Sequence, residues 1–280
     1  MKKLVFTLAT CCIMCACEQK TETNPFFTEF RTEYGAPDFD KIKIEHYEPA
    51  FLKGIEEQNA EIKAIVESRE TPGFENTIVA LDNSGRTLAR VKGVFYALTE
   101  ADTNDEMSAL SEKIAPVLSE HNDNIYLNQD LYKRVAAVWQ QEQEGKITLT
   151  TEQHRLLDRY YKAFIRSGAG LDAGKQNRLR EINKELSTLA ITFSNHVLNE
   201  NNAYRLVIDN EAELAGLPEW VKTGAAEEAK AVGKEGKWLF TLQNSSRLPL
   251  LQYADNRELR KDIYEAYINR GNNGDANDNK

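Results

Sequence analysis

Hydrophobic side chains recur every three or four residues along most of the chain, which is the spacing of one face of an α-helix. A first stripe follows Pro49, a residue suited to the first turn of a helix, and it ends at Val66. The Pro72-Gly73 break separates this stripe from a second one, which runs from Ile78 to Leu98. The pattern predicts two amphipathic helices in this part of the chain.

Two capping boxes mark the starts of later helices. In this motif a Thr side chain accepts a hydrogen bond from the backbone three residues on, and a Glu or Gln at that position reaches back. Thr103 with Glu106 predicts one start, and Thr150 with Gln153 predicts another. A helix between them is expected to end at Gly145, because glycine readily adopts the left-handed conformation of a helix C-terminus.

The longest predicted helix carries a narrow apolar seam with alternating spacings of three and four residues. Such a seam is suited to packing against an antiparallel helix. Its members are Leu179, Ile182, Leu186, Leu189, Phe193 and Val197.

Two short segments have the composition of β-strands, which favour β-branched and aromatic residues. They are "YRLVID" at Tyr204–Asp209 and "KWLFTLQ" at Lys237–Gln243. A short helix is expected between them, and Asn256 is expected to cap a final helix. The pattern does not fix the strand direction. The expected fold is mainly α, a multi-helix lobe of antiparallel-packed helices with a small two-stranded β element near residues 204–243.

Composition and charge exclude some classes of function. The 280 residues are 41% hydrophobic and 28% charged, which is ordinary for a globular protein. The formal net charge is −9, so the chain lacks the basic surplus that a nucleic-acid-binding protein needs to neutralise phosphates.

The N-terminus resembles a bacterial lipoprotein signal. Lys2 and Lys3 precede a mostly apolar stretch, 4–14, which is shorter than the roughly 20 residues of a membrane-spanning helix. The sequence "IMCAC" then reads as a lipobox, with cleavage after residues 1–16 and lipidation of Cys17. A plain secretory signal and a metal site are the alternatives for this cysteine cluster, which comprises Cys11, Cys12, Cys15 and Cys17.

The lipobox predicts an exported, membrane-anchored protein facing the periplasm or the cell surface. Removal of residues 1–16 takes away two lysines and no acid, so the formal net charge changes from −9 to −11. Anionic headgroups repel such a surface, and the anchor is therefore expected to be the lipid. Glu18 after the modified cysteine mildly favours the outer membrane. Residues 17–36 read as a tether whose aromatic side chains dock on the body.

No catalytic motif is visible in the sequence. None of the four histidines belongs to HExxH. His196 and Glu200 lie on one face of a predicted helix and could share a metal, but an ordinary exposed pair of side chains is the favoured interpretation. "GAGLDAGK" at 168–175 lacks the Walker A pattern and follows a helix, so a helix–helix connection is favoured. Ser245 and Ser246 have no partner histidine at an informative spacing. We predict no catalytic, cofactor-binding or metal-binding residue in this chain.

Several blocks, in order, resemble the N-terminal part of the thimet oligopeptidase and peptidyl-dipeptidase family of zinc metallopeptidases. The resemblance extends over nearly all of residues 25–280 and is closest to the peptidyl-dipeptidases (dipeptidyl carboxypeptidases), with the oligopeptidase A type as the near rival. The blocks include "PDFDKIKIEHYEPAFLKGIEEQNAEIKAI" at 37–65, "LTTEQHRLLDRYYKAFIRSGAGL" at 149–171 and "NRELRKDIYEAYINRGNNGDANDNK" at 256–280.

The resemblance implies that residues 37–280 form the helical N-terminal lobe of a peptidase that acts on short peptides. Family members hold zinc with HExxH and a downstream glutamate in a C-terminal catalytic half, which is absent from this sequence. The chain alone is then expected to be inactive, and the tail "GNNGDANDNK" to lead into the missing half. Whether such a truncation is natural stays open. The competing hypotheses are a stand-alone helical lipoprotein that binds peptides or partners without catalysis, and a degenerate remnant of the gene.

Overall fold

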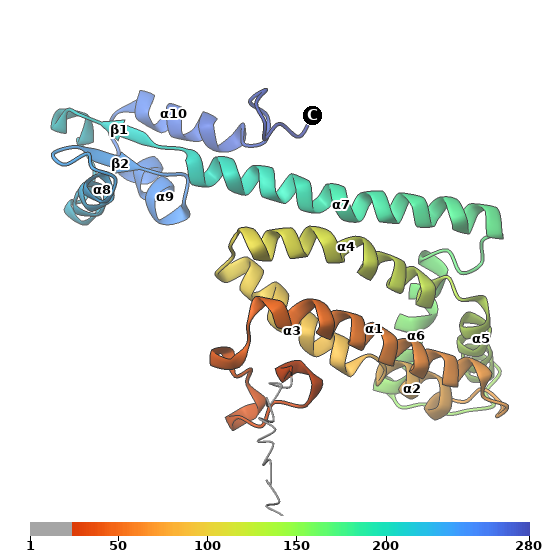
Figure 1. Cartoon of the computed structure of the whole chain (residues 1–280). Coiled ribbons are helices and arrows are strands. Elements are labelled where there is room, and N and C mark those ends of the chain that lie inside the picture. The colour runs from red at the N-terminus through yellow and green to blue at the C-terminus, as the bar shows by residue number, and fades with distance from the viewer. Residues whose placement is uncertain (1–23) are drawn as a thin grey trace, which may run out of the picture.

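The computed structural model describes residues 24–280. The predicted signal segment 1–16, the lipidation site Cys17 and the start of the tether lie outside the described residues. A larger helical unit built from α1–α6 lies beside the first part of the long helix α7, and a smaller unit lies at the other end of α7 (Figure 1). The predicted fold class is confirmed, since helices dominate and two short strands form the small β element.

Helix α1, Ile44–Glu67, begins five residues before the predicted start at Pro49. The amide of Lys43 donates to Nδ1 of His46 at 3.1 Å and caps the helix there. Pro49 therefore lies inside the helix, where it cannot donate to the carbonyl of Glu45. Its position near the N-terminus of α1 makes this loss tolerable.

The predicted second stripe is divided between separate segments. A π-helical segment, Phe74–Val79, leads into the short helix α2, Ala80–Asp82, and α3 follows at Arg86–Ala101. The turn before α3 needs Gly85, whose φ of +72° is costly for residues with a side chain. Periodicity alone cannot reveal this turn, because the apolar positions on both sides continue the same spacing.

The capping predictions have different outcomes. Helix α4, Asp105–Tyr126, is capped by Asn104, whose side chain accepts from the Met107 amide at 2.9 Å, so the Thr103 box is wrong. Helix α5, Gln129–Gln143, is followed by Gly145 in a left-handed conformation, as predicted. Helix α6, Thr151–Arg166, begins with the predicted Thr150 and Gln153 box.

Aromatic side chains organise the core of the larger unit. Tyr47 and Phe51 of α1 both meet Phe95 of α3, with ring centroids 5.1 Å and 5.3 Å apart. Phe26, in a 3₁₀ turn at Pro25–Phe27, is fully buried against the same cluster, whereas Tyr34 is 96% exposed. The described part of the tether thus docks through some of its aromatic residues only. The other short 3₁₀ turns are Glu33–Gly35, Phe39–Lys41 and Glu211–Leu214.

Helix α7, Ala173–Ala203, packs antiparallel on α4 through its polar face (Figure 1). The contacts include Arg180 with Asn124 at 2.8 Å, Asn183 with Asp123 at 2.7 Å and Asn195 with Glu112 at 2.8 Å.

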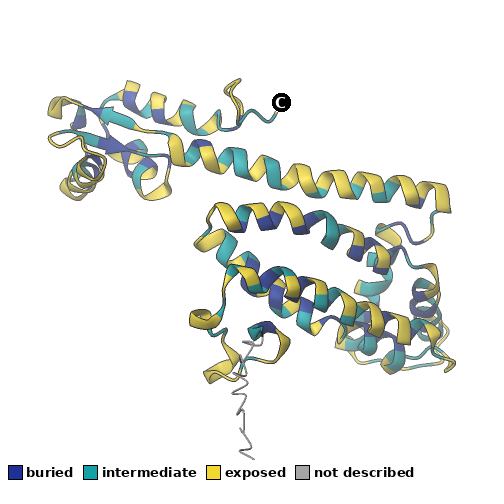
Figure 2. Cartoon of the chain, in the orientation of Figure 1, coloured by how far each residue is buried: buried dark blue, intermediate teal, exposed yellow. Residues whose placement is uncertain are grey.

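The predicted apolar seam of α7 is not the contact with α4. Leu186, Leu189 and Phe193 are each more than half exposed, and Ile182 is more than a third exposed. Figure 2 shows α7 as mostly exposed along its length. The helix was predicted correctly, but the middle of its seam, from Ile182 to Phe193, is exposed in the described structure, whereas Leu179 and Val197 at its ends are half-buried.

The smaller unit contains the β element and the last helices. Strand β1, Leu206–Ile208, pairs antiparallel with β2, Trp238–Phe240, so the strands are slightly shorter than predicted. Helix α8, Glu219–Ala231, lies between them in sequence, as predicted. Helix α9, Asn244–Tyr253, was not predicted, and α10, Arg257–Ile268, is capped by Asn256 as predicted.

The last ten residues return to the C-terminal part of α7 (Figure 1). The backbone at Gly271 turns with a φ of +71°. Over the described part of the chain, each helix is too short or too polar to cross a lipid bilayer.

Candidate functional site

The four histidines are engaged separately and do not form a metal site. His46 caps α1, His121 is buried between helices, His154 pairs with Glu142, and His196 contacts the last residues. Across residues 24–280, no group of three or more His, Cys, Asp or Glu side chains is arranged to hold a metal ion. The described residues therefore do not fit a zinc centre.

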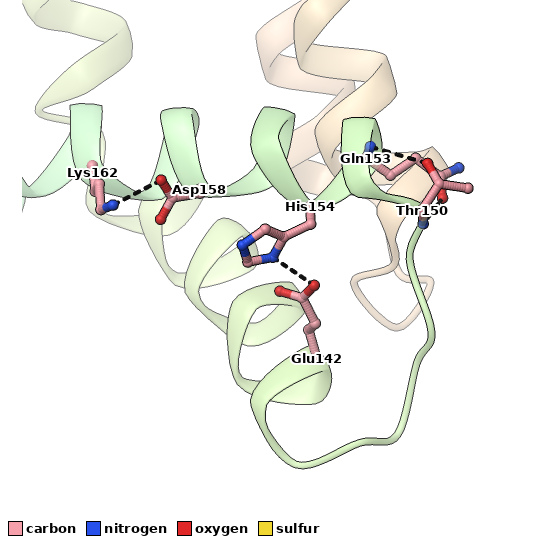
Figure 3. Close-up of polar contacts among 6 residues, drawn as sticks. All are labelled: Glu142, Thr150, Gln153, His154, Asp158 and Lys162. Atoms are coloured by element: carbon pink, nitrogen blue, oxygen red, sulfur yellow. Dashed lines mark hydrogen bonds and ion pairs between the residues drawn. The ribbon is translucent and has the colours of Figure 1, made fainter.

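The pair formed by Glu142 and His154 joins the end of α5 to the start of α6 (Figure 3). Nδ1 of His154 lies 2.8 Å from Oε1 of Glu142, next to the capping box of α6. Trp139 stacks on Tyr161 beside this pair, with ring centroids 4.7 Å apart and planes at 4°. These contacts fasten two helices and give the pair a structural role.

His121 is the most deeply buried histidine, with 5% of its surface exposed. Nε2 donates to Oε1 of Gln58 at 2.7 Å, because an amide oxygen can only accept, and Nδ1 then has no partner among the described residues. Burial, followed by the nearby Lys92 ammonium, lowers the pKa of His121 below its ordinary value. Burial in the core therefore favours the neutral form of His121.

His196 and Glu200 do not share a ligand site. Nδ1 of His196 lies 2.8 Å from Oδ1 of Asn279. Oε2 of the buried Glu200 accepts from the Gly271 amide at 2.9 Å and from Nδ2 of Asn273 at 2.7 Å. Both side chains hold the returning segment 271–280 against α7.

The glycine-containing loop at 168–175 is a helix–helix connection, as predicted. It joins α6 to α7, and Asp172 caps α7 by accepting from the Lys175 amide at 3.0 Å. The Lys175 ammonium pairs with the same carboxylate at 3.0 Å.

A cavity of about 440 Å³ lies where the end of α7 meets the smaller unit. Its floor is apolar and buried, and it consists of Val221 and Ala225 of α8 with Leu239 and Phe240 of β2. Trp220, which is 61% exposed, also lines it. The cavity has the mixed character of small-ligand sites, in which an apolar surface is combined with a few polar groups.

Polar and charged side chains line the rest of this cavity. Arg205 follows α7, Glu228 belongs to α8, and Ser245 and Ser246 belong to the first turn of α9. Such groups can bind and orient a ligand, and they include no nucleophile with an adjacent base. The sequence identified the serines only as lacking a catalytic partner. The signal for the cavity is spread over segments 201–205, 220–228 and 239–246, so no local motif could reveal it.

A second cavity, of about 390 Å³, adjoins the first, and both are lined by Asn201 and Gln243. Phe193 and Val197 of the α7 seam line it together with Tyr267 of α10. The exposed seam therefore leads towards the end of α7 where the two cavities meet.

Curated proteins similar to this chain are peptidases. No protein-family model matches the chain. Dipeptidyl carboxypeptidase of Escherichia coli K12 is 38% identical over 260 residues, which are 93% of this chain and 38% of that protein. Dipeptidyl carboxypeptidase of Salmonella typhimurium LT2 is 39% identical over 258 residues, 92% of this chain and 38% of that protein. Oligopeptidase A of the same Salmonella strain is 32% identical over 258 residues, 92% of this chain and 37% of that protein.

The chain spans less than two fifths of the length of these relatives. The similarity nevertheless extends across both structural units, because it covers more than nine tenths of the chain. The order of similarity also agrees with the sequence resemblance, since the dipeptidyl carboxypeptidases share more identical residues than oligopeptidase A does. The chain therefore belongs to the thimet oligopeptidase family, which includes dipeptidyl carboxypeptidase and oligopeptidase A.

Proposed function

We propose that this chain is the N-terminal substrate-channel portion of a lipid-anchored zinc metallopeptidase that releases C-terminal dipeptides from short peptides. The observation that carries the proposal is the 38% identity to dipeptidyl carboxypeptidase over 93% of the chain. The name of that relative describes removal of dipeptides from the carboxyl end, which gives the proposed reaction its direction. Hydrolysis of internal bonds, as in an oligopeptidase A type enzyme, is the nearest variant.

The surface of α7 supports a role as part of a larger protein. The seam comprising Ile182, Leu186, Leu189 and Phe193 is exposed along successive turns. An exposed contiguous apolar surface is typical of an interface. We propose that the remaining part of the peptidase covers this seam, and that the two parts together enclose the channel for short peptides.

The zinc site belongs to the proposed catalytic part and not to this chain. Zinc bound by two histidines and a glutamate with an open position supplies an activated water for peptide hydrolysis. The four histidines here are separated and engaged, as described above, and no metal cluster exists among residues 24–280. We therefore assign no catalytic step to any residue of this chain, and the chain alone is proposed to be inactive.

The membrane anchor is proposed to be an acyl-modified Cys17, with the protein facing the periplasm or cell surface and the outer membrane favoured. The support is the lipobox "IMCAC" after a short apolar segment. Growth with a labelled fatty acid should label the chain, and Cys17→Ala should remove the label. Labelling that survives this substitution would reject Cys17 as the anchor.

The catalytic proposal is tested with a peptide that has a free C-terminus and with its amidated counterpart. The gene should encode HExxH in frame after Lys280, and the resulting longer protein should release dipeptides from the free peptide. A chelator should abolish this activity, and added zinc should restore it. The 280-residue chain, assayed in parallel, should bind no stoichiometric zinc and cleave neither peptide. Hydrolysis by the short chain, or a longer protein without zinc-dependent activity, would refute the proposal.

The second candidate function is a helical lipoprotein that binds peptides without cleaving them. The mixed polar and apolar cavity at the end of α7 favours it. It predicts peptide binding by the 280-residue chain together with an in-frame stop directly after Lys280, so the downstream reading frame separates it from the first proposal.

A further inference from the structure

The cavity at the end of α7 contains charges of both signs that are not paired with each other. Arg205 and Glu228 both line it, and neither forms an ion pair with a charged side chain among residues 24–280. Both side chains are exposed. A ligand with one negative and one positive group is therefore electrostatically complementary to this cavity.

Arg205 is held by the backbone that leads out of α7. One of its terminal nitrogens, Nη1, donates to the carbonyls of Asn202 at 2.6 Å and Tyr204 at 2.8 Å. Nε and Nη2 make no hydrogen bond to the described residues and remain available to a ligand. A guanidinium with this freedom is suited to a carboxylate, which it can bind through two parallel hydrogen bonds.

The first turn of α9 adds donors on the same cavity. Ser245 and Ser246 line it, and Gln243 at the N-cap supplies no side-chain acceptor to this turn. The side-chain nitrogen Nε2 of Gln243 instead donates to Oδ1 of Asn202 at 3.2 Å. The hydroxyl and backbone amide of Ser245, which lines the cavity in this first turn, therefore add to the attraction that Arg205 exerts on a carboxylate.

The apolar floor of the cavity and Gly224 of α8 indicate the space that a ligand can fill. Leu239, Phe240, Val221 and Ala225 present buried apolar surface, which suits an uncharged side chain. A Cβ built on Gly224 of α8 would meet no atom within 4 Å, so the cavity is open above this glycine. A volume of about 440 Å³ lies within the range of small-ligand sites.

We propose that this cavity binds short peptides as zwitterions, with the C-terminal carboxylate at Arg205 and the N-terminal ammonium at Glu228. An apolar side chain of the peptide lies on the floor formed by α8 and β2. The choice of a peptide as ligand rests on the proposed function. The opposite charges in one cavity favour a zwitterion over a multiply charged anion, because Glu228 repels the latter.

The test is titration of the 280-residue chain with the dipeptide alanyl-leucine, its C-terminal amide and its N-acetyl form. Binding is followed by calorimetry and by fluorescence, with Trp220→Phe used to assign the fluorescence change to the cavity. The unmodified chain should bind the dipeptide at least tenfold more tightly than the amide, which is the scale of one charge-assisted hydrogen bond. Arg205→Ala should weaken dipeptide binding to the same degree and should no longer distinguish the dipeptide from its amide. Glu228→Gln should likewise remove the preference over the acetylated form.

Two further variants separate a cavity site from general charge effects. Gly224→Leu fills the open space and improves the helix propensity of α8, so it should abolish dipeptide binding without lowering the thermal midpoint. Arg257→Ala removes an exposed guanidinium from α10, outside the cavity lining, and should bind like the unmodified chain.

Three outcomes would overturn the proposal. These are undetectable dipeptide binding, unchanged binding by Gly224→Leu, or an Arg205→Ala variant that still prefers the carboxylate over the amide. The readout is binding to a chain that need not hydrolyse anything. The binding assay and the hydrolysis assay are therefore independent. Absence of dipeptide binding would not argue against zinc-dependent hydrolysis by a longer protein, and absence of that hydrolysis would not argue against dipeptide binding.

Discussion

The close approach of α1 and α3 gives a quantitative test of the packing in the larger unit. Gly54 of α1 is buried, and a Cβ added there would lie 2.8 Å from both the Cα and the backbone nitrogen of Leu88 in α3. The atoms met are backbone atoms and cannot rotate away. Gly54→Ala should therefore push the two helices apart along their contact.

The expected cost follows from two opposing effects. Overpacking a core costs about 1–3 kcal/mol, and contact with backbone atoms favours the upper part of this range. Replacement of a helical glycine by alanine stabilises by about 1 kcal/mol. Gly54→Ala should therefore lower the free energy of unfolding by about 1–2 kcal/mol, or the Tm by roughly 2–8 °C at about 2–4 °C per kcal/mol.

A matched control lies in the partner helix. Gly93 of α3 is exposed, and a Cβ there would meet nothing within 4 Å. Gly93→Ala should gain the higher helix propensity of alanine without a clash with a neighbouring helix, and it should raise the free energy of unfolding by about 0.5–1 kcal/mol. Equilibrium denaturation followed by far-UV circular dichroism measures both variants. A Gly54→Ala variant as stable as the unmodified chain, or one shifted in the same direction as Gly93→Ala, would refute the close-packing argument.

Other features make shorter predictions. Because the folded-state pKa of His121 is lowered, its contribution to stability is fully present above the unfolded pKa of about 6.5 and falls as the pH drops below that value, and His121→Gln should flatten this part of the pH profile of Tm. Glu200→Ala should leave the buried amide of Gly271 unpaired at a cost of about 1–3 kcal/mol. Compared with the unmodified chain, this variant should exchange amide hydrogens faster in 271–280 and at an unchanged rate in α3. Replacing Leu186 and Phe193 by Glu should reduce hydrophobic-dye binding or self-association without lowering helicity, whereas unchanged dye binding would place the exposed apolar surface elsewhere.

Local chemistry explains which parts of the fold the sequence could predict. The Thr150 box and the Asn256 cap were predicted correctly because each depends on residues within one helical turn. The start of α4 was displaced by one residue, since Thr103 and Asn104 are adjacent and both are able to cap. Helix α9 was missed because its polar first turn and Pro249 give little helical signal.

Tertiary arrangement explains what the sequence could not provide. The seam of α7 has the periodicity of a packed helix, but α4 packs on the polar face of α7 instead, through Arg180, Asn183 and Asn195. Periodicity reports that a face is apolar and not which element covers it. The cavity containing Arg205 and Glu228 brings together segments that are distant in sequence, and neither residue has a neighbouring motif that marks it.

Helix α7 connects the two units, so its number of residues determines how the smaller unit is rotated relative to the larger one. Its 31 residues extend over about 46 Å, and side chains of α4 fix its rotation as far as Asn195. Each residue added or deleted between Asn195 and Ala203 would turn the smaller unit by about 100° around the helix axis. The cavity would then face a different side of the larger unit, and contacts that span this stretch, such as that of Asn279 with the Phe193 carbonyl, would be broken. The number of residues in this last stretch of α7 therefore sets the orientation of the cavity relative to the larger unit.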